Sequence, residues 1–347
     1  MNNQEWLDLR KSGIGGSDAS AILGLSPWKS PMDIWLDKKG LLEEAPDPKR
    51  DAIREFGLEA EPFIARKYEE QTGRKLRKVL HGIMRDGQCE FLFGSPDRLV
   101  VGGEPIGVEL KTENIFQDNF GEPGTDQVPM HYLVQCAWYM MLTAYPEWHI
   151  ALLRGDRQVA IYVIKRDLEL EQTIRERCIS WWNTHIIGDI PPDIDGSNAW
   201  ALYLTKKHPA NITPPIEAEH EHEYLAEKLL QGIELQAKVE AEIEAVKNQL
   251  KQIIGDADGL RGDFGKITWR KSKDSVVVDW KGAFSHALSW MDAAQAQECI
   301  DHFSTHRIGS RRFVFNPAKK ELQNGNGTAG TAALIGNGAE AASTARD

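Results

Sequence analysis

The sequence SPDRLVVGGEPIGVELK, residues 95–111, decides the fold of this chain. Its two apolar segments, RLVV at 98–101 and IGVEL at 106–110, are separated by a pair of glycines. Glycine readily adopts the positive φ angles that tight turns require. This pattern predicts two strands joined as an antiparallel hairpin, and the apolar runs at 91–93 and 159–164 predict further strands.

Three charged residues of the hairpin are expected to lie close together. Side chains alternate between the faces of a strand, so Glu109 and Lys111 point the same way and Leu110 points into the core. If the hairpin folds about Gly103, Asp97 lies across from Glu109 on that same face. Directly opposed like charges destabilise a sheet unless something compensates them. A hard divalent cation bound by carboxylate oxygens would do so.

This arrangement suits Mg²⁺, which binds proteins through few carboxylates and takes its other ligands from water and substrate phosphate. Lys111 beside the cation could orient or activate the attacking water, or stabilise charge that grows on the phosphorane. The alternative is that Asp97 belongs to a turn and that Glu109 and Lys111 form a solvated strand face, as most charged residues do.

Two helices carry further candidate residues. A helix is expected at 57–72, and its Glu61 could supply another carboxylate, although a glutamate on a helix surface usually faces solvent. A buried helix is expected at 128–142, where Gln135 lies among apolar and aromatic neighbours. A core amide bonded to backbone explains Gln135 equally well.

The glycine-rich segment GIGGSD at 13–18 follows Arg10 and leads into a predicted helix. Such a turn can hold phosphate with the backbone N–H groups of the helix N-terminus. No Gly-Lys-Ser/Thr follows, so ATP binding is not indicated. The alternative is a simple turn with Ser17 or Asp18 as the helix N-cap. A bidentate phosphate contact explains Arg10 better than a cap does.

Together these motifs resemble those of the PD-(D/E)xK nucleases, and among them the phage lambda exonuclease/YqaJ viral recombinase (alkaline exonuclease) family. The resemblance covers most of residues 6–164. It rests on W-x3-R at 6–10, GIGGSDASAILGLSPW at 13–28, G-x3-E at 57–61, SPD…ExK at 95–111 and Y-x2-Q at 132–135. It implies an α/β fold with a restriction-endonuclease-like core, in which helices flank a central mixed sheet.

The resemblance also implies a role for each matching residue. Asp97 and Glu109 would be the metal carboxylates, and Lys111 the catalytic lysine. The Leu110 carbonyl would be a backbone metal ligand, and Glu61 a carboxylate near the metals.

Four more positions match residues of the family's site. Gln135 would be a polar residue of the catalytic site, and Arg10, Ser17 and Ser95 match the positions that hold a 5′ phosphate. The implied reaction is Mg²⁺-dependent hydrolysis of the 5′-ended strand of linear double-stranded DNA, 5′→3′, with Mn²⁺ expected to substitute. The products would be 3′ single-stranded overhangs for phage-type homologous recombination.

The family resemblance also implies partners. Lambda-type members form trimers and pass the exposed 3′ strand to a single-strand annealing protein, so a homo-oligomer and such a partner are expected. Two other readings stay open. One is an endonuclease or structure-specific nuclease with the same core. The other is a non-catalytic DNA-binding or scaffold protein that uses residues 216–254 as a partner-binding helix.

The composition restricts the class of protein and its expected location. The net charge of −11 argues against a DNA partner, but the stretch 66–85 is locally basic, so the total charge decides nothing. No apolar run is long enough for a membrane span, and the N-terminus lacks the apolar core of a signal peptide. The four cysteines form no CxxC pair. We therefore expect no zinc finger, and a phage or mobile-element protein in the cytoplasm of a bacterial host.

The chain is expected to contain five parts. They are a nuclease core at 1–195, a linker at 196–215, a long acidic amphipathic helix at 216–255, a small α+β extension at 256–316 and a disordered tail at 317–347. The apolar seam of the long helix suggests coiled-coil pairing. Within the extension, 266–270 and 275–280 are expected to pair as strands, with 311–315 as a third strand.

Overall fold

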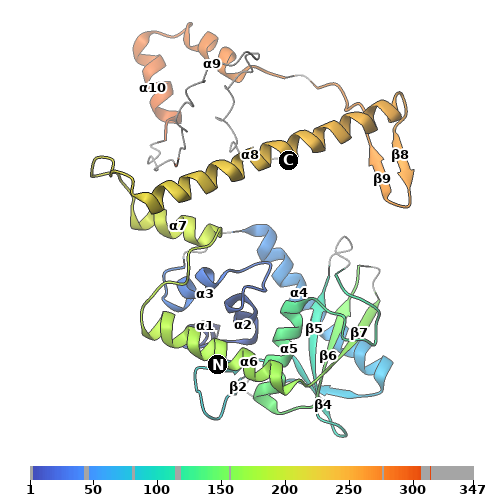
Figure 1. Cartoon of the computed structure of the whole chain (residues 1–347). Helices are drawn as coiled ribbons and strands as arrows, with labels where there is room; N and C mark the ends of the chain where they lie inside the picture. The colour runs from blue at the N-terminus through green and yellow to red at the C-terminus, as the bar shows by residue number, and fades with distance from the viewer. Residues whose placement is uncertain are drawn as a thin grey trace, which may run out of the picture. The chain divides into compact units, whose positions relative to one another are not determined.

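The structure is a computed structural model, shown in Figure 1, and describes residues 3–42, 47–79, 83–113, 119–155, 158–275, 277–305 and 313. The chain forms two units, Met1–His208 and Pro209–Asp347. The division falls inside the segment expected to be a linker, 196–215. The first part of that segment is not a linker, because it forms helix α7 (Asn198–Lys207) with Ala199 and Trp200 buried in the first unit.

The first unit contains a five-stranded sheet of order β1-β4-β5-β6-β7. The strands are β1 (Lys75–Arg77), β4 (Arg98–Val101), β5 (Ile106–Thr112), β6 (Glu147–Leu153) and β7 (Val159–Lys165). β5 and β6 are parallel and all other neighbours are antiparallel. The expected central mixed sheet is therefore confirmed.

The hairpin predicted from residues 95–111 is β4–β5. Arg98 pairs with Val108, and the turn contains Gly102 and Gly103 at φ angles of 72° and 68°. β6 lies beside this hairpin and was not predicted. The sequence reading therefore missed one of the two strands that flank β5.

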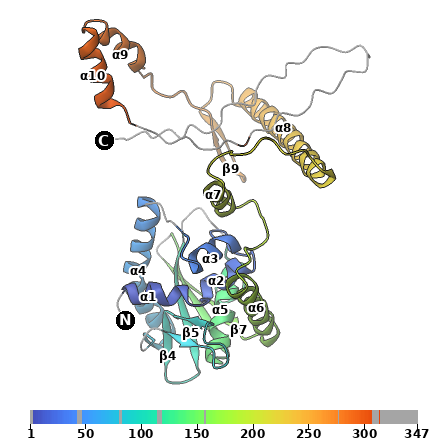
Figure 2. The ribbon, with the colours of Figure 1, turned by 90° about the vertical axis from the view of Figure 1, so that its left-hand side faces the viewer.

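Helices cover both faces of the sheet. α4 (Pro48–Thr72) starts earlier than the expected 57 and ends at Gly73, which has a φ of 70°. Its buried residues pack with Ile106, Val108 and Leu110 of β5 in one apolar cluster. The other helices of the core lie in a second cluster: α2 (Gly16–Ile22), α3 (Pro31–Lys38), α5 (Met130–Thr143) and α6 (Leu168–Trp181). Figure 2 shows α4 and α6 at opposite sides of this unit.

α1 (Asn3–Lys11) precedes the glycine-rich segment, and the segment η1 (Trp182–Ile187) continues α6. The strand expected at 91–93 is shorter and shifted: β3 (Phe93–Gly94) pairs with β2 (Met84–Arg85) in a separate two-stranded sheet. Beside it, Ile14 N–H donates to the Phe91 carbonyl at 2.7 Å. A Cβ on Gly13 would lie 2.2 Å from that same carbonyl oxygen, so this close approach requires glycine.

The second unit contains the long helix α8 (His220–Ile254), in the region where one helix was expected. The hairpin that follows pairs β8 (Gly259–Gly262) with β9 (Gly265–Thr268). The predicted pairing of 266–270 with 275–280 is therefore wrong. Gly259 and Gly265, at φ angles of 155° and 100°, allow the tighter hairpin, which takes the preceding segment as the partner of β9.

α9 (Trp280–Leu288) and α10 (Ala293–Phe303) complete this unit. The expected third strand, apart from Phe313, and the tail at 317–347 lie outside the described residues. Among the helices that the structure describes, none is both long and apolar enough to cross a bilayer.

Candidate active site

The β4–β5 hairpin brings Asp97 together with Glu109 and Lys111, the two charged residues of the ExK motif. The pairing of Arg98 with Val108 places Asp97 opposite Glu109. Oδ2 of Asp97 accepts a hydrogen bond of 2.8 Å from the Leu110 N–H. Nζ of Lys111 donates to Oε1 of Glu109 at 2.7 Å. The two acids and the lysine therefore lie together at one end of the hairpin, and Asp97, Glu109 and Lys111 are called the ExK cluster below.

Glu109 is only 3% exposed, and its two carboxylate oxygens differ in their hydrogen bonding. Oε1 accepts hydrogen bonds from Lys111 and from Nε2 of Gln135, the latter at 2.8 Å. Oε2 is buried and has no hydrogen-bond partner among the residues that the structure describes. A buried carboxylate oxygen without a partner is costly, so this atom is the natural place for a further ligand.

The electrostatics of the cluster favour an added cation. Burial and then the neighbouring Glu109 raise the pKa of Asp97 to about 8, against the opposing effect of Lys111. Burial alone would lower the pKa of Lys111, but Glu109 and Asp97 raise it instead, so the ammonium stays charged. The single ammonium of Lys111 does not compensate the negative charge of both acids. Asp97, with a pKa of about 8, therefore keeps its proton at neutral pH.

The residues present fit a hard divalent cation. Two carboxylates, one with an unpartnered oxygen, are the ligands that Mg²⁺ takes from a protein when substrate phosphate and water supply the rest. In the described ranges, no three His, Cys, Asp or Glu side chains gather into a self-sufficient metal site. The cluster therefore suits a cation whose coordination shell is completed by the substrate. The Leu110 peptide, expected to add a carbonyl ligand, lies beside Asp97 through its own N–H.

Glu61 lies near this cluster but has a cationic partner. Its Oε2 accepts from Nη2 of Arg98 at 3.3 Å, and Nη1 of the same arginine donates to the Asp97 carbonyl. Glu61 is close enough to contribute to the raised pKa of Asp97. The structure thus places Glu61 beside the site, paired with Arg98, which the sequence reading did not include.

The glycine-rich segment caps α2 differently from the sequence expectation. The N-cap is Gly15, not Ser17 or Asp18, and Oδ2 of Asp18 accepts from the Gly15 N–H at 3.1 Å. Ser17 is exposed in the first turn. A Cβ on Gly16 would lie 3.2 Å from the Tyr139 ring and 3.3 Å from Gln135. The N-terminus of α2 therefore packs against the residue that holds Glu109.

Ser95 lies near the same part of α5. It follows Gly94, where an added Cβ would lie 2.8 Å from the Tyr139 ring. The hydroxyl of Tyr139 accepts from Nε2 of Gln135 at 3.1 Å. Tyr139 therefore lies between the segment that carries Ser17 and the segment that carries Ser95. The sequence reading missed Tyr139, although its spacing of four from Gln135 places both on one helix face.

Arg10 has an acidic partner that the sequence reading did not anticipate. Its guanidinium lies 3.5 Å from Oδ1 of Asp18, and its side chain is 34% exposed. Nζ of Lys38 is fully buried and donates to Oδ2 of Asp18 and to the Arg10 carbonyl, each at 2.7 Å. Burial alone would raise the pKa of Asp18, but Lys38 and Arg10 hold it below its usual value. This network fixes Arg10 beside the start of α2.

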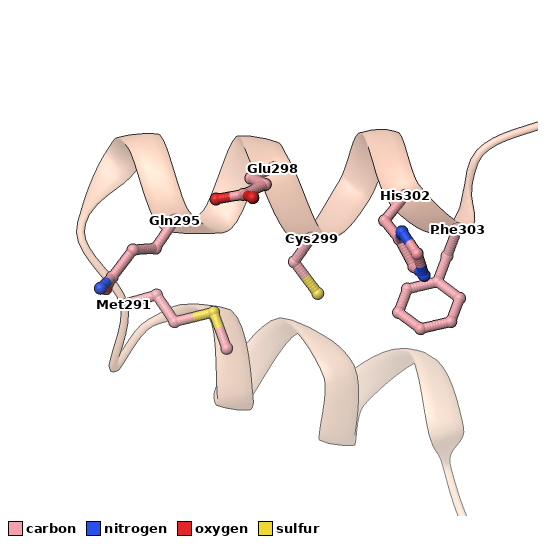
Figure 3. Close-up of a pocket in the computed structure, with 6 residues that line it drawn as sticks. All are labelled: Met291, Gln295, Glu298, Cys299, His302 and Phe303. Atoms are coloured by element: carbon pink, nitrogen blue, oxygen red, sulfur yellow. The ribbon is translucent and has the colours of Figure 1, made fainter.

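The second unit has a pocket of its own, which Figure 3 shows along α10. Its lining residues are Met291, Gln295, Glu298, Cys299, His302 and Phe303. None of them is among the residues predicted for the site. The ExK cluster therefore remains the candidate for catalysis.

Comparison with known proteins identifies the family of the chain. Residues 5–146 match the model of the YqaJ-like viral recombinase domain, and this range contains every residue predicted for the site. The protein YqaJ of Bacillus subtilis strain 168, named as uncharacterized, is 31% identical over 274 residues, which cover 78% of this chain and 84% of that protein.

Two solved structures are also similar. An alkaline exonuclease from Laribacter hongkongensis is 18% identical, with a TM-score of 0.42, over 59% of this chain and 97% of that one. A phage-related exonuclease from Haemophilus somnus 129PT is 16% identical, with a TM-score of 0.40, over 51% and 96%. The extent and identity of the match to the Bacillus protein decide the assignment: the chain belongs to the YqaJ-like viral recombinase family.

Proposed function

We propose that this protein is a Mg²⁺-dependent DNA exonuclease, able to use Mn²⁺, that degrades the 5′-ended strand of linear double-stranded DNA. The 3′ single-stranded overhangs that result would serve phage-type recombination. The observation that carries the proposal is the cluster of Asp97, Glu109 and Lys111, in which Oε2 of Glu109 is buried without a partner in the described part of the chain. Membership of a viral recombinase family supports the same conclusion.

Each residue of the cluster has a chemical task. A bound divalent cation would supply Lewis-acid polarisation of the scissile phosphate and of the attacking water. Asp97 and Glu109 would hold it, and Gln135 keeps Glu109 in one orientation through its hydrogen bond to Oε1. The Lys111 ammonium remains charged and stabilises negative charge that develops on the phosphoryl oxygens.

The α2 N-terminus would select the end of the DNA. It presents backbone N–H groups next to the exposed Ser17 hydroxyl, and it packs against Gln135. Backbone N–H groups at a helix N-terminus bind phosphate, and Arg10 adds a guanidinium that is partly exposed. Ser95, which follows Gly94 beside Tyr139, would contribute its hydroxyl to the same phosphate. A terminal 5′ phosphate held here would lie near the ExK cluster.

Time courses on two DNA substrates test the proposal. The full chain is incubated with linear 5′-phosphorylated duplex and with closed circular duplex, in Mg²⁺ and in EDTA, and Glu109→Gln is the matched control. We expect loss of the linear 5′-labelled strand in Mg²⁺ only, with the circle intact and Glu109→Gln inactive. Cleavage of the circle would make the protein an endonuclease. Duplex binding without any hydrolysis would make it a non-catalytic DNA-binding protein.

A further inference from the structure

Trp28 is an exposed tryptophan beside the candidate active site. It lies in the connection between α2 and α3 and is 67% exposed. The other tryptophans of the first unit whose side chains the structure describes are all buried: Trp35, Trp138, Trp148, Trp181, Trp182 and Trp200. A tryptophan can bury 150–250 Å² of surface, so leaving one in water next to a polar site needs a reason.

Ring contacts connect Trp28 to the ExK cluster. Its indole lies 4.7 Å from the His131 ring and 6.1 Å from the Tyr132 ring, measured between centroids. Nζ of Lys111 lies 5.1 Å from the centroid of the same Tyr132 ring. Both partners of Trp28 are in the first turn of α5, and Gln135 follows one turn later. A continuous path of contacts therefore leads from the indole to the catalytic lysine.

The connection fixes the backbone at Trp28 without covering the indole. The backbone N–H groups of Trp28 and Lys29 donate to the Ser26 hydroxyl, each at 3.3 Å, and Ser30 caps α3. His131 meets the indole at 80° and Tyr132 at 49°, so neither ring stacks in parallel on it. Within the described residues, the indole thus has fixed support from the protein and an open apolar surface.

We infer that Trp28 is a stacking platform for a nucleobase of the substrate, close to the scissile phosphate. This inference rests on the proposed function and adds a binding subsite to it. Aromatic side chains stack on bases of any sequence, because every base has a π face. A nuclease that must accept any sequence gains affinity in this way without reading the bases. Lys111 and the carboxylates would act on the phosphate while Trp28 holds the base beside it.

Fluorescence of 2-aminopurine tests the inference. Linear 5′-phosphorylated duplexes carry the probe at one of the first few positions, and Ca²⁺ replaces Mg²⁺ to keep the complex intact. We expect the full chain to quench the probe at one or two positions. Trp28→Ala should lose this quenching and bind about 5- to 150-fold more weakly. Trp28→Phe should keep most of the quenching and most of the affinity, because it retains a ring that can stack.

Leu25→Ala is the matched control. Leu25 is 41% exposed in the same connection and has no ring, so its removal should leave quenching and affinity unchanged. Unchanged quenching and affinity in Trp28→Ala would overturn the platform. So would a change in self-association with the probe signal intact, because Trp28 would then be a protein contact.

Hydrolysis in Mg²⁺ distinguishes a failure of the stacking platform from a failure of the proposed nuclease function. If the wild-type chain degrades linear duplex and Trp28→Ala does so equally well, only the platform is wrong. If the wild-type chain neither binds nor degrades the duplex, the proposed function fails, and the platform fails with it.

Discussion

The side-chain amide of Gln135 donates a hydrogen bond of 2.8 Å to Oε1 of Glu109, the same oxygen that accepts from Lys111. A helix and a strand thus fix one carboxylate between them. Because Oε1 is fully engaged, Oε2 is the oxygen left for a ligand. The bond also couples α5, which contacts the start of α2, to the strand that carries the two charged residues of the ExK motif.

Gln135→Leu removes this fixation while keeping a side chain of similar size. Loss of a group that orients a metal ligand lowers metal affinity or activity by about 10- to 100-fold. We expect a loss of that size in kcat on linear duplex, with little change in KM. Gln172→Leu is the control, since Gln172 is exposed on α6 and its partner is Glu176. Equal rates in the wild type and Gln135→Leu would show that the bond is only structural.

Glu109→Gln and Lys111→Ala should each reduce hydrolysis by at least about a hundredfold, because each removes a group that acts on the reacting phosphate. Duplex binding should survive in both. Rates are measured on linear duplex in saturating Mg²⁺, and binding is measured by anisotropy in Ca²⁺. Lys49→Ala, at an exposed lysine in the first turn of α4 and outside the basic stretch 66–85, should behave like the wild type. Wild-type rates in either site variant would remove that residue from the mechanism.

Asp97 should make the metal-free protein less stable as pH rises. Its pKa of about 8 in the folded chain lies above the ordinary value of 3.8, so the folded state binds the proton more tightly than the unfolded state. The free energy of unfolding in EDTA should therefore fall between about pH 4 and pH 8. This contribution should be absent in Asp97→Asn.

Mg²⁺ should restore the stability of the wild type at pH 8, because the cation then replaces the proton as the compensating charge. Urea denaturation at pH 5, 6.5 and 8, with and without Mg²⁺, measures both effects. A pH profile that is the same in the wild type and Asp97→Asn would contradict this reading of the site.

His149 should give the opposite pH dependence at a different part of the sheet. It is buried on β6, where its ring contacts the Tyr68 hydroxyl at 2.7 Å and the Glu147 carboxylate. Burial lowers the pKa of His149 below 6.5, despite the opposing effect of Glu147. The unfolded chain therefore binds the proton more tightly, and the free energy of unfolding should fall as pH drops below about 6.5.

His149→Gln should remove most of this acid sensitivity, although it lowers stability at neutral pH because Tyr68 and Glu147 lose their partner. The difference between the two proteins in urea denaturation, followed from pH 7.5 to pH 5.5, measures it. A constant difference across that range would show that His149 does not titrate in it.

Arg10 should determine how strongly the enzyme depends on a 5′ phosphate. Removal of that phosphate should slow initiation in the wild type much more than in Arg10→Ala, because only the wild type loses a guanidinium–phosphate contact. Arg10→Ala also leaves Asp18 with Lys38 as its cation, so a melting temperature is measured for each variant. Equal slowing in both proteins would leave Arg10 as a structural partner of Asp18 only.

The local sequence pattern was sufficient to predict the β4–β5 hairpin. Two apolar segments around a glycine pair predicted β4 and β5, and alternation of side chains placed Asp97 opposite Glu109. The same reasoning failed for β9, because two segments next to it could serve as its partner. The structure pairs β9 with the preceding segment, β8, across a turn that ends at Gly265, whose φ is 100°.

Local sequence patterns of this kind did not predict the contacts between distant segments. Nothing near Lys38 in the sequence indicated that its amine would be buried against Asp18 and Arg10. Likewise, β6 was missed because its apolar run also suits a helix or a loop, and only its pairing with β5 and β7 makes it a strand.

The amino-acid sequence by itself determined which residues are candidates for the chemistry, since the order of small motifs and the two-residue alternation of a strand are local properties. Tertiary structure alone decided how those residues are held. Gln135 of α5 reaches Glu109 of β5, and Tyr139 and the α2 N-terminus pack against Gln135 in turn. The packing of helices on the sheet brings these segments together although they are far apart in sequence. Burial within that packing also leaves one oxygen of Glu109 without a partner and raises the pKa of Asp97, because a carboxylate is costly to charge away from water.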